Sequence, residues 1–154
     1  MENITKERLM QAGWYLGRII DISEFENKYK EIGMEMPGIV KDFLRTYGNL
    51  EITFSKEFRN APFKEEISIN PMKAIGLYLD SEYFATLLSD YGIESMAYPI
   101  GLESRGNLIM VMTEDGVFYS FTDGCLCMNG KCAEDMLDCV VGETRLPELM
   151  EETK

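Results

Sequence analysis

The sequence predicts a single α+β domain, with N-terminal helices, an antiparallel β-sheet that ends in a meander, and a closing helix. Apolar residues recur at helical spacing before residue 48, and an apolar–polar alternation begins at Leu50. Two Asp-Gly turns, Asp115-Gly116 and Asp123-Gly124, then separate short apolar runs. The chain has 154 residues, a length that suits one domain. We place that domain at residues 1–142 and expect residues 143–154 to form a polar tail that frays.

Three short helices are predicted in the first third of the chain. The opening helix covers residues 5–12. The next covers residues 22–32, where apolar side chains follow one another at intervals of three and four residues, and Ser23 is its expected N-cap. The third begins after Pro37, a residue that suits a helix start. It ends at Gly48, and its apolar stripe consists of Ile39, Val40, Phe43, Leu44 and Tyr47.

The strands are predicted from Leu50 onward. Residues 50–55 and 66–70 alternate between apolar and polar side chains, so each segment is expected to bury one face. The two Asp-Gly turns connect apolar runs and therefore indicate an antiparallel meander of three strands. These three runs are residues 108–112, 117–121 and 125–128.

Further helices are expected between and after these strands. One begins at Pro71, and another covers residues 82–91 with Asp80 or Ser81 as its N-cap. The last covers residues 131–141. This order of elements is typical of an α+β domain.

Composition excludes several classes of function. The chain contains no histidine, which rules out imidazole-based triads, dyads, metal ligands and pH switches. The formal net charge of −12 argues against nucleic-acid binding, because the field of the protein repels a polyanion, and favours basic partners. No apolar stretch approaches the ~20 residues of a spanning helix, and the N-terminus lacks a signal-peptide pattern. We therefore expect a cytoplasmic protein without a membrane partner.

Four cysteines lie close together near the C-terminus. Their spacing does not match the paired knuckles of a zinc site, so we interpret them as small core residues beneath the meander, with no metal or redox role assigned. A cysteine pattern confined to one segment is also a poor disulfide framework, which favours a reducing compartment. The four residues are Cys125, Cys127, Cys132 and Cys139.

Carboxylates are abundant, and several are adjacent in sequence, such as Glu65-Glu66 and Glu114-Asp115. Adjacent residues on a strand or helix point in different directions, so adjacency does not predict a catalytic pair. We interpret these residues as solvated, and Glu114-Asp115 as part of a turn. Met34 and Met36, near Gly33 and Pro37, are the methionines expected to be exposed on an adaptable binding surface.

The only tryptophan, Trp14, is expected to anchor the core between two helices. Arg18, four residues later, is expected to bond a buried carboxylate or main-chain carbonyls and so to fix the start of a helix.

An ordered set of motifs resembles the third immunity-protein subgroup of the SUKH superfamily. The resemblance covers roughly residues 13–142, and Asn49 stands where that subgroup commonly has glycine. The motif residues on which it rests most directly are Gly13, Trp14, Gly17, Arg18, Phe43, Leu44, Gly48, Pro99, Gly101 and Gly116. Asn49 tolerates the same left-handed backbone as glycine, so the departure changes little.

The resemblance implies a non-catalytic protein without a cofactor that neutralises a cognate toxin of a bacterial polymorphic system by binding it. Many such toxins act on nucleic acid, and an acidic binder would meet a basic toxin with steered association. The expected contacts lie on acidic loops: Glu65, Glu66, Asp80, Glu82, Glu103 and Asp123. Two alternatives stay open, a regulatory protein-interaction module of the same fold and a small hydrolase that uses carboxylates or a thiol.

Overall fold

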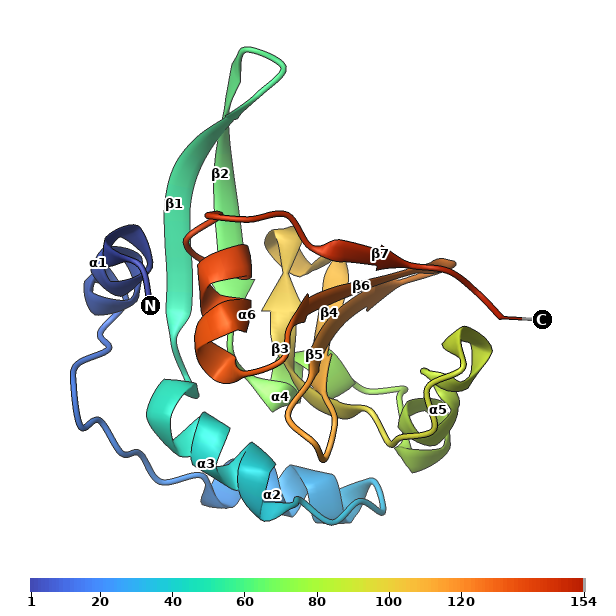
Figure 1. The fold of residues 1–154 in the computed structure, drawn as a ribbon. Helices are drawn as coiled ribbons and strands as arrows, with labels where there is room; N and C mark the ends of the chain where they lie inside the picture. The colour runs from blue at the N-terminus through green and yellow to red at the C-terminus, as the bar shows by residue number, and fades with distance from the viewer. Residues whose placement is uncertain (154) are drawn as a thin grey trace.

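A seven-stranded antiparallel sheet forms the centre of the computed structural model, which describes residues 1–153 and, at Phe58, the backbone alone. The strands follow one another across the sheet in sequence order, so every neighbour in the sheet is also a neighbour along the chain (Figure 1). They are β1 (Glu51–Phe58), β2 (Ala61–Ser68), β3 (Tyr98–Glu103), β4 (Leu108–Met112), β5 (Phe118–Thr122), β6 (Cys125–Gly130) and β7 (Glu148–Met150). With helices before the sheet and one near its end, the predicted α+β fold is confirmed.

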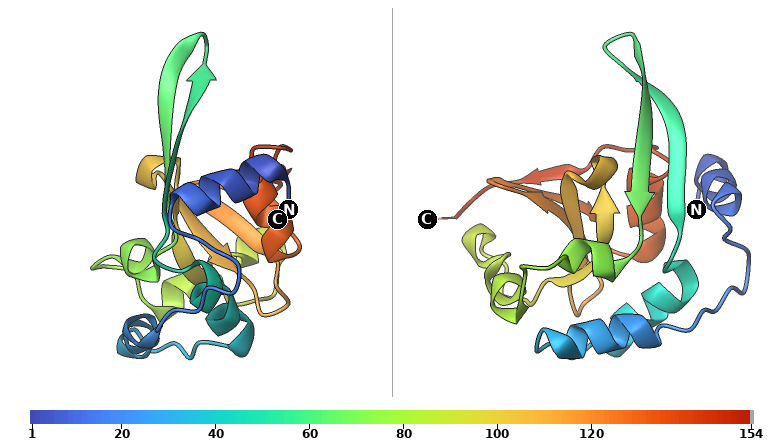
Figure 2. Two further views of the ribbon diagram at one scale, coloured as in Figure 1. Left: turned by 90° about the vertical axis from the view of Figure 1, so that its left-hand side faces the viewer. Right: turned by 180° about the vertical axis from the view of Figure 1, so that it is seen from behind.

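The helices lie around the edges and on both faces of this sheet. Figure 1 shows α6 in front of the sheet, and the reverse view in Figure 2 shows α4 on the other side. The helices are α1 (Asn3–Gln11), α2 (Ser23–Glu31), α3 (Gly38–Tyr47), α4 (Pro71–Ile75), α5 (Ser81–Thr86) and α6 (Ala133–Val140), with 3-10 turns η1 (Ser89–Tyr91) and η2 (Ser104–Gly106). Within the described part of the chain, no helix has the length and apolar character needed to cross a membrane.

Two helix predictions need correction at their ends. Ser23 is the first residue of α2 and does not cap it through its side chain; Asp21 Oδ1 instead accepts the Ser23 backbone N–H at 2.9 Å. The predicted helix over 82–91 is divided into α5 and η1. At its start, Asp80 rather than Ser81 is the N-cap, because the Asp80 carboxylate accepts the Tyr83 N–H at 3.1 Å.

Contacts between α2 and β3 connect the helical half of the molecule to the sheet. Tyr29 is fully buried, and its hydroxyl donates to the Pro99 carbonyl at 2.6 Å. The strand register shifts between Pro99 and Gly101, and a Cβ at Gly101 would lie 2.1 Å from the Ser68 carbonyl oxygen. Glycine is therefore required where β3 passes β2.

Trp14 and Arg18 pack against the C-terminal end of α3. The Trp14 ring stacks on Tyr47 with centroids 6.2 Å apart and is partly buried at the edge of the core, rather than within it. Arg18 donates to the carbonyls of Thr46 and Gly48, each at 2.8 Å, so its guanidinium satisfies groups at the end of a helix rather than at a helix start. Asn49, which follows, has φ 63°, the left-handed conformation expected of it.

The hairpin β1–β2 extends well beyond the body of the molecule (Figures 1 and 2). Its strands pair from Glu51↔Ser68 to Phe58↔Ala61, and Arg59 and Asn60 form the turn with positive φ values of 53° and 64°. The strand predicted from the sequence covers residues 50–55 and does not include the distal half of the hairpin. A segment that extends into solvent buries no face, so it lacks the alternation that identifies a half-buried strand.

The segment after α6 is ordered, so the prediction of a fraying tail is wrong for Glu148–Met150. These residues form β7 and pair antiparallel with β6, from Leu126↔Met150 to Met128↔Glu148. Further on, the Thr153 N–H donates to the Asp90 carbonyl at 2.8 Å. Main-chain hydrogen bonds hold this segment, and a polar side-chain pattern gives no indication of them.

Candidate functional site

The six acidic residues predicted to contact a partner do not form one surface. Glu65 and Glu103 are buried, with 5% and 9% of their surface exposed, so the prediction that they face a partner is wrong. Glu65 occupies an inward position of β2, whereas its neighbour Glu66 is exposed. The other three, Asp80, Glu82 and Asp123, are exposed elsewhere on the molecule.

The exposed set lies where α5 meets the β5–β6 turn. Burial raises the pKa of the Tyr83 hydroxyl, and the negative charge of Asp123 raises it further. Asp123 therefore lies close to α5, although it is 40 positions from Tyr83 in the sequence. Asp80 caps the start of this helix, and Glu82 lies in its first turn. Residues from two distant segments are therefore brought together here.

The C-terminal segment adds further carboxylates at the same place. Thr153 binds the main chain of η1, and Tyr91 of η1 has its pKa raised by burial and then by the charge of Glu152. We define the acidic end of the molecule as the exposed residues Asp80, Glu82, Asp90, Asp123, Glu151 and Glu152.

No lysine or arginine occurs in the sequence at residues 74–104, 106–130 or 146–153, the segments that supply the acidic end. Asp90, Glu151 and Glu152 are not among the contact residues predicted from the sequence. The absence of basic residues from these long stretches is the pattern that could have identified them.

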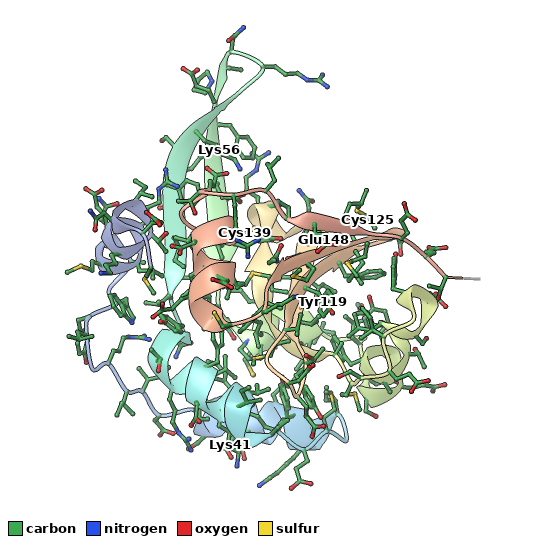
Figure 3. All side chains as sticks on the ribbon, in the orientation of Figure 1. Lys41, Lys56, Tyr119, Cys125, Cys139 and Glu148 are labelled. Carbon is green, nitrogen blue, oxygen red and sulfur yellow. The ribbon has the colours of Figure 1, made fainter. Side chains whose placement is uncertain are left out.

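The two buried carboxylates belong to a polar network beneath α6. Lys56 Nζ lies 3.4 Å from Glu65 Oε2 and 2.7 Å from Glu143 Oε2. In Figure 3, Lys56 on β1 and Cys139 on α6 lie toward the hairpin end of the sheet, and Cys125 lies toward the opposite end. The network therefore connects strand β1 of the projecting hairpin to the segment that follows α6.

Burial raises the pKa of Glu103 to about 7. A hydrogen bond from Ser120 and the charge of Lys56 oppose this shift in the pKa, and the charge of Glu65 adds to it. Ser120 in turn accepts a hydrogen bond from Asn129 Nδ2 at 2.6 Å. A carboxyl group with this pKa has the property of a general acid near neutral pH.

The cavity beside Glu103 is small for a substrate site. Its volume is about 170 Å³, below the ~300 Å³ at which small-molecule pockets usually begin. The thiols near it are poor nucleophiles, because burial raises the pKa of Cys127 to about 11 and also raises that of Cys139. The geometry therefore favours a structural role for this network.

The prediction that all four cysteines are core residues is confirmed for only one of them. Cys139 is buried, Cys125 and Cys127 are half-buried, and Cys132 is exposed because it precedes α6 at the N-cap position rather than on the helix's apolar face. Across residues 1–153, no group of three or more cysteine or acidic side chains is placed to hold a metal ion. Met34 and Met36 are buried, which contradicts the prediction of an exposed methionine surface.

Comparison with known proteins gives a family. No curated protein and no solved structure matches the chain. The model of one family, the SUKH-3 immunity protein, matches residues 1–143 and so covers nearly all of the sequence. The motif from Gly13 to Arg18, which packs against α3, lies within that range. The chain therefore belongs to the SUKH-3 immunity protein family.

Proposed function

We propose that this protein binds a cognate toxin through the acidic end and covers a basic, phosphate-binding face of that toxin. Membership of the SUKH-3 family gives the toxin-immunity role in general. The observation that supports the finer proposal is the convergence of α5, the β5–β6 turn and residues 148–153, whose exposed charges are all negative among the residues that the structure describes. In the reducing cytoplasm the four cysteines remain thiols.

Charge complementarity explains why such a surface suits a toxin that acts on nucleic acid. Such an enzyme holds phosphates with lysine and arginine. A cluster of carboxylates meets the same side chains, accelerates the encounter and excludes the nucleic acid from the groove. The same charges keep the immunity protein itself from binding nucleic acid.

The role is non-catalytic in this proposal. SUKH-3 immunity proteins are generally non-catalytic, and the two buried carboxylates are held in an internal network. The hydrolase alternative rests on the pKa of Glu103, about 7, and on the polar groups beside it. Glu103→Gln separates the two, because it abolishes acid catalysis but preserves neutralisation by binding.

The direct test uses the protein encoded immediately upstream of this gene as the candidate toxin. We expect co-expression to protect cells and the two proteins to co-purify as a complex whose association rate falls as salt rises. A complete lack of protection and of complex formation would reject the proposal and favour a regulatory module of the same fold.

A further inference from the structure

A hollow of about 380 Å³ lies between α3, the β4–β5 turn and the start of α6. Two aromatic contacts stiffen its floor: Phe43 lies 5.3 Å from Tyr47 and 5.1 Å from Phe118, measured between ring centroids. The walls are completed by apolar side chains from α3, from the end of β4 and from the start of α6. The apolar lining residues are Ile39, Phe43, Tyr47, Met112, Phe118 and Ala133.

Two carboxylates stand on the rim of this hollow, Asp42 from α3 and Asp115 from the turn. The hydroxyl of Thr113 donates to the Asp115 carboxylate and orients it. Asp42 is 80% exposed and lies 3.3 Å from Arg45 in a surface ion pair, which a partner's cation can share. Lys131 is the one lysine or arginine among the lining residues.

The β4–β5 turn that carries Asp115 also approaches the loop after α2. Burial and the charges of Glu114 and Glu35 raise the pKa of Tyr98, so the turn at Asp115 approaches the loop after α2. That loop adjoins α5, because the Ser81 N–H donates to the Ile32 carbonyl at 3.3 Å. The loop after α2 is therefore next to both the β4–β5 turn and α5, and it lines a hollow that contains Glu26 and Glu35 together with Lys30 and Lys41.

A second hollow of about 480 Å³ adjoins the first and shares Thr46 and Tyr47 with it. Its lining includes Leu16 and Ile19, which are 91% and 76% exposed. Exposed aliphatic side chains grouped beside a hollow mark interaction surfaces more often than single ones do. The apolar surface is therefore wider than the first hollow alone.

We propose that the first hollow receives an aromatic or branched aliphatic side chain of the toxin, presented by a segment that carries lysine or arginine beside it. This inference rests on the proposed function and adds an apolar anchor to the acidic end. The hollow supplies a rigid aromatic floor, and its rim supplies carboxylates for the flanking cations. A second copy of this chain is a poorer occupant, because two molecules of charge −12 repel each other.

The chemistry of the hollow can be tested without the toxin, because the exposed thiol of Cys132 lies in its lining. Three disulfide reagents are compared, each made from cysteamine acylated with lysyl-phenylalanine, glutamyl-phenylalanine or lysyl-alanine. Conjugation of Cys132 is measured by peptide mass spectrometry at a fixed concentration of 2-mercaptoethanol. Cys132→Ser is the control for reaction at the other thiols.

The lysyl-phenylalanine reagent is expected to occupy Cys132 about threefold more than either of the others. The paired change Asp42→Asn with Asp115→Asn should lower the occupancy of Cys132 by the lysyl-phenylalanine reagent to that of the glutamyl-phenylalanine reagent. Equal occupancy by all three reagents, or a preference for the glutamyl reagent, overturns the proposal.

The second experiment uses the upstream toxin and compares Ile39→Glu with Met10→Glu. Ile39 lines the hollow and is 40% exposed, whereas Met10 is 59% exposed on α1 and does not line it. Both variants should keep the melting temperature. We expect Ile39→Glu to raise the dissociation rate of the complex about tenfold or more and Met10→Glu to leave it unchanged.

Equal dissociation rates for Ile39→Glu and Met10→Glu, in a complex that still forms, overturn the apolar anchor and leave the proposed function standing. If the unaltered protein does not bind the toxin, the proposed function fails and the docking of the toxin fails with it.

Discussion

Two groups of carboxylates in this protein lie in opposite surroundings, one buried beneath α6 and the other exposed to solvent. Glu65 and Glu103 lie beneath α6, where Lys56, Ser120 and neighbouring strands surround them. The residues of the acidic end lie in solvent within residues 74–104, 106–130 and 146–153, ranges that contain no lysine or arginine. Burial makes the first group depend on its partners and raises the pKa of Glu103 to about 7, while exposure leaves the second group free to act at long range.

The number of acidic residues alone therefore does not indicate where a basic partner binds. A buried carboxylate is compensated locally, so little of its field reaches solvent. An exposed cluster without counter-charges acts over about a Debye length. Four variants test this contrast, in order of the size of their expected effects.

The largest expected effect is the pH dependence that Glu103 imposes on stability. Its pKa in the folded protein is about 7, above the usual 4.5, so folding favours the protonated form. The contribution of Glu103 to stability is therefore most favourable below pH 4.5 and falls as pH rises to about 7, by a total on the order of 3 kcal/mol.

Glu103→Gln removes this dependence. We expect the variant to unfold at higher urea concentration than the unaltered protein at pH 8, and at a similar concentration near pH 5. Urea titrations of both proteins at four pH values between 5 and 8 measure this difference in the unfolding midpoint. Parallel pH profiles for the two proteins would show that Glu103 does not titrate in this range.

The next effect comes from the cation of the buried network. Lys56→Met keeps the aliphatic stem but leaves Glu65 buried without its counter-ion, at an expected cost of about 2 kcal/mol in the free energy of unfolding. Lys64→Met, at an exposed position of β2, is the matched control and should cost little. Denaturant unfolding at pH 7 compares them, and an equal cost for both would contradict the network.

At the acidic end the expected effect is on binding and not on stability. The double change Glu82→Lys with Asp123→Lys should lower the association rate with the toxin about tenfold at low salt and flatten its salt dependence. Glu7→Lys with Glu57→Lys changes the net charge equally at other exposed positions. Stopped-flow mixing should separate the two pairs, and identical rates would show that only net charge matters.

The smallest effect is expected at Glu66, which the sequence analysis grouped with the partner contacts. It is exposed on β2 and belongs neither to the buried network nor to the acidic end. Glu66→Lys should change the free energy of unfolding by less than about 0.5 kcal/mol and leave toxin association nearly unchanged. A tenfold slower association would show that the hairpin belongs to the interface.

Local sequence features determined much of the fold. Helical spacing predicted α2 and α3, alternation predicted the start of β1, and the Asp-Gly dipeptides predicted turns in which Gly116 and Gly124 have positive φ. The ordered motifs from Gly13 to Gly48 indicated the family that the comparison then confirmed. Each of these features depends on residues that are close in sequence, so the chain alone contains the necessary information.

The tertiary structure alone decided which acidic residues are functional candidates. The register of β2 and β3 together with the position of α6 placed Glu65 and Glu103 inside. Main-chain hydrogen bonds added β7 and brought Thr153 to Asp90, next to a turn and a helix from other parts of the chain. Burial and proximity between distant segments depend on how the elements pack, and hydrophobic periodicity within one segment does not encode that packing.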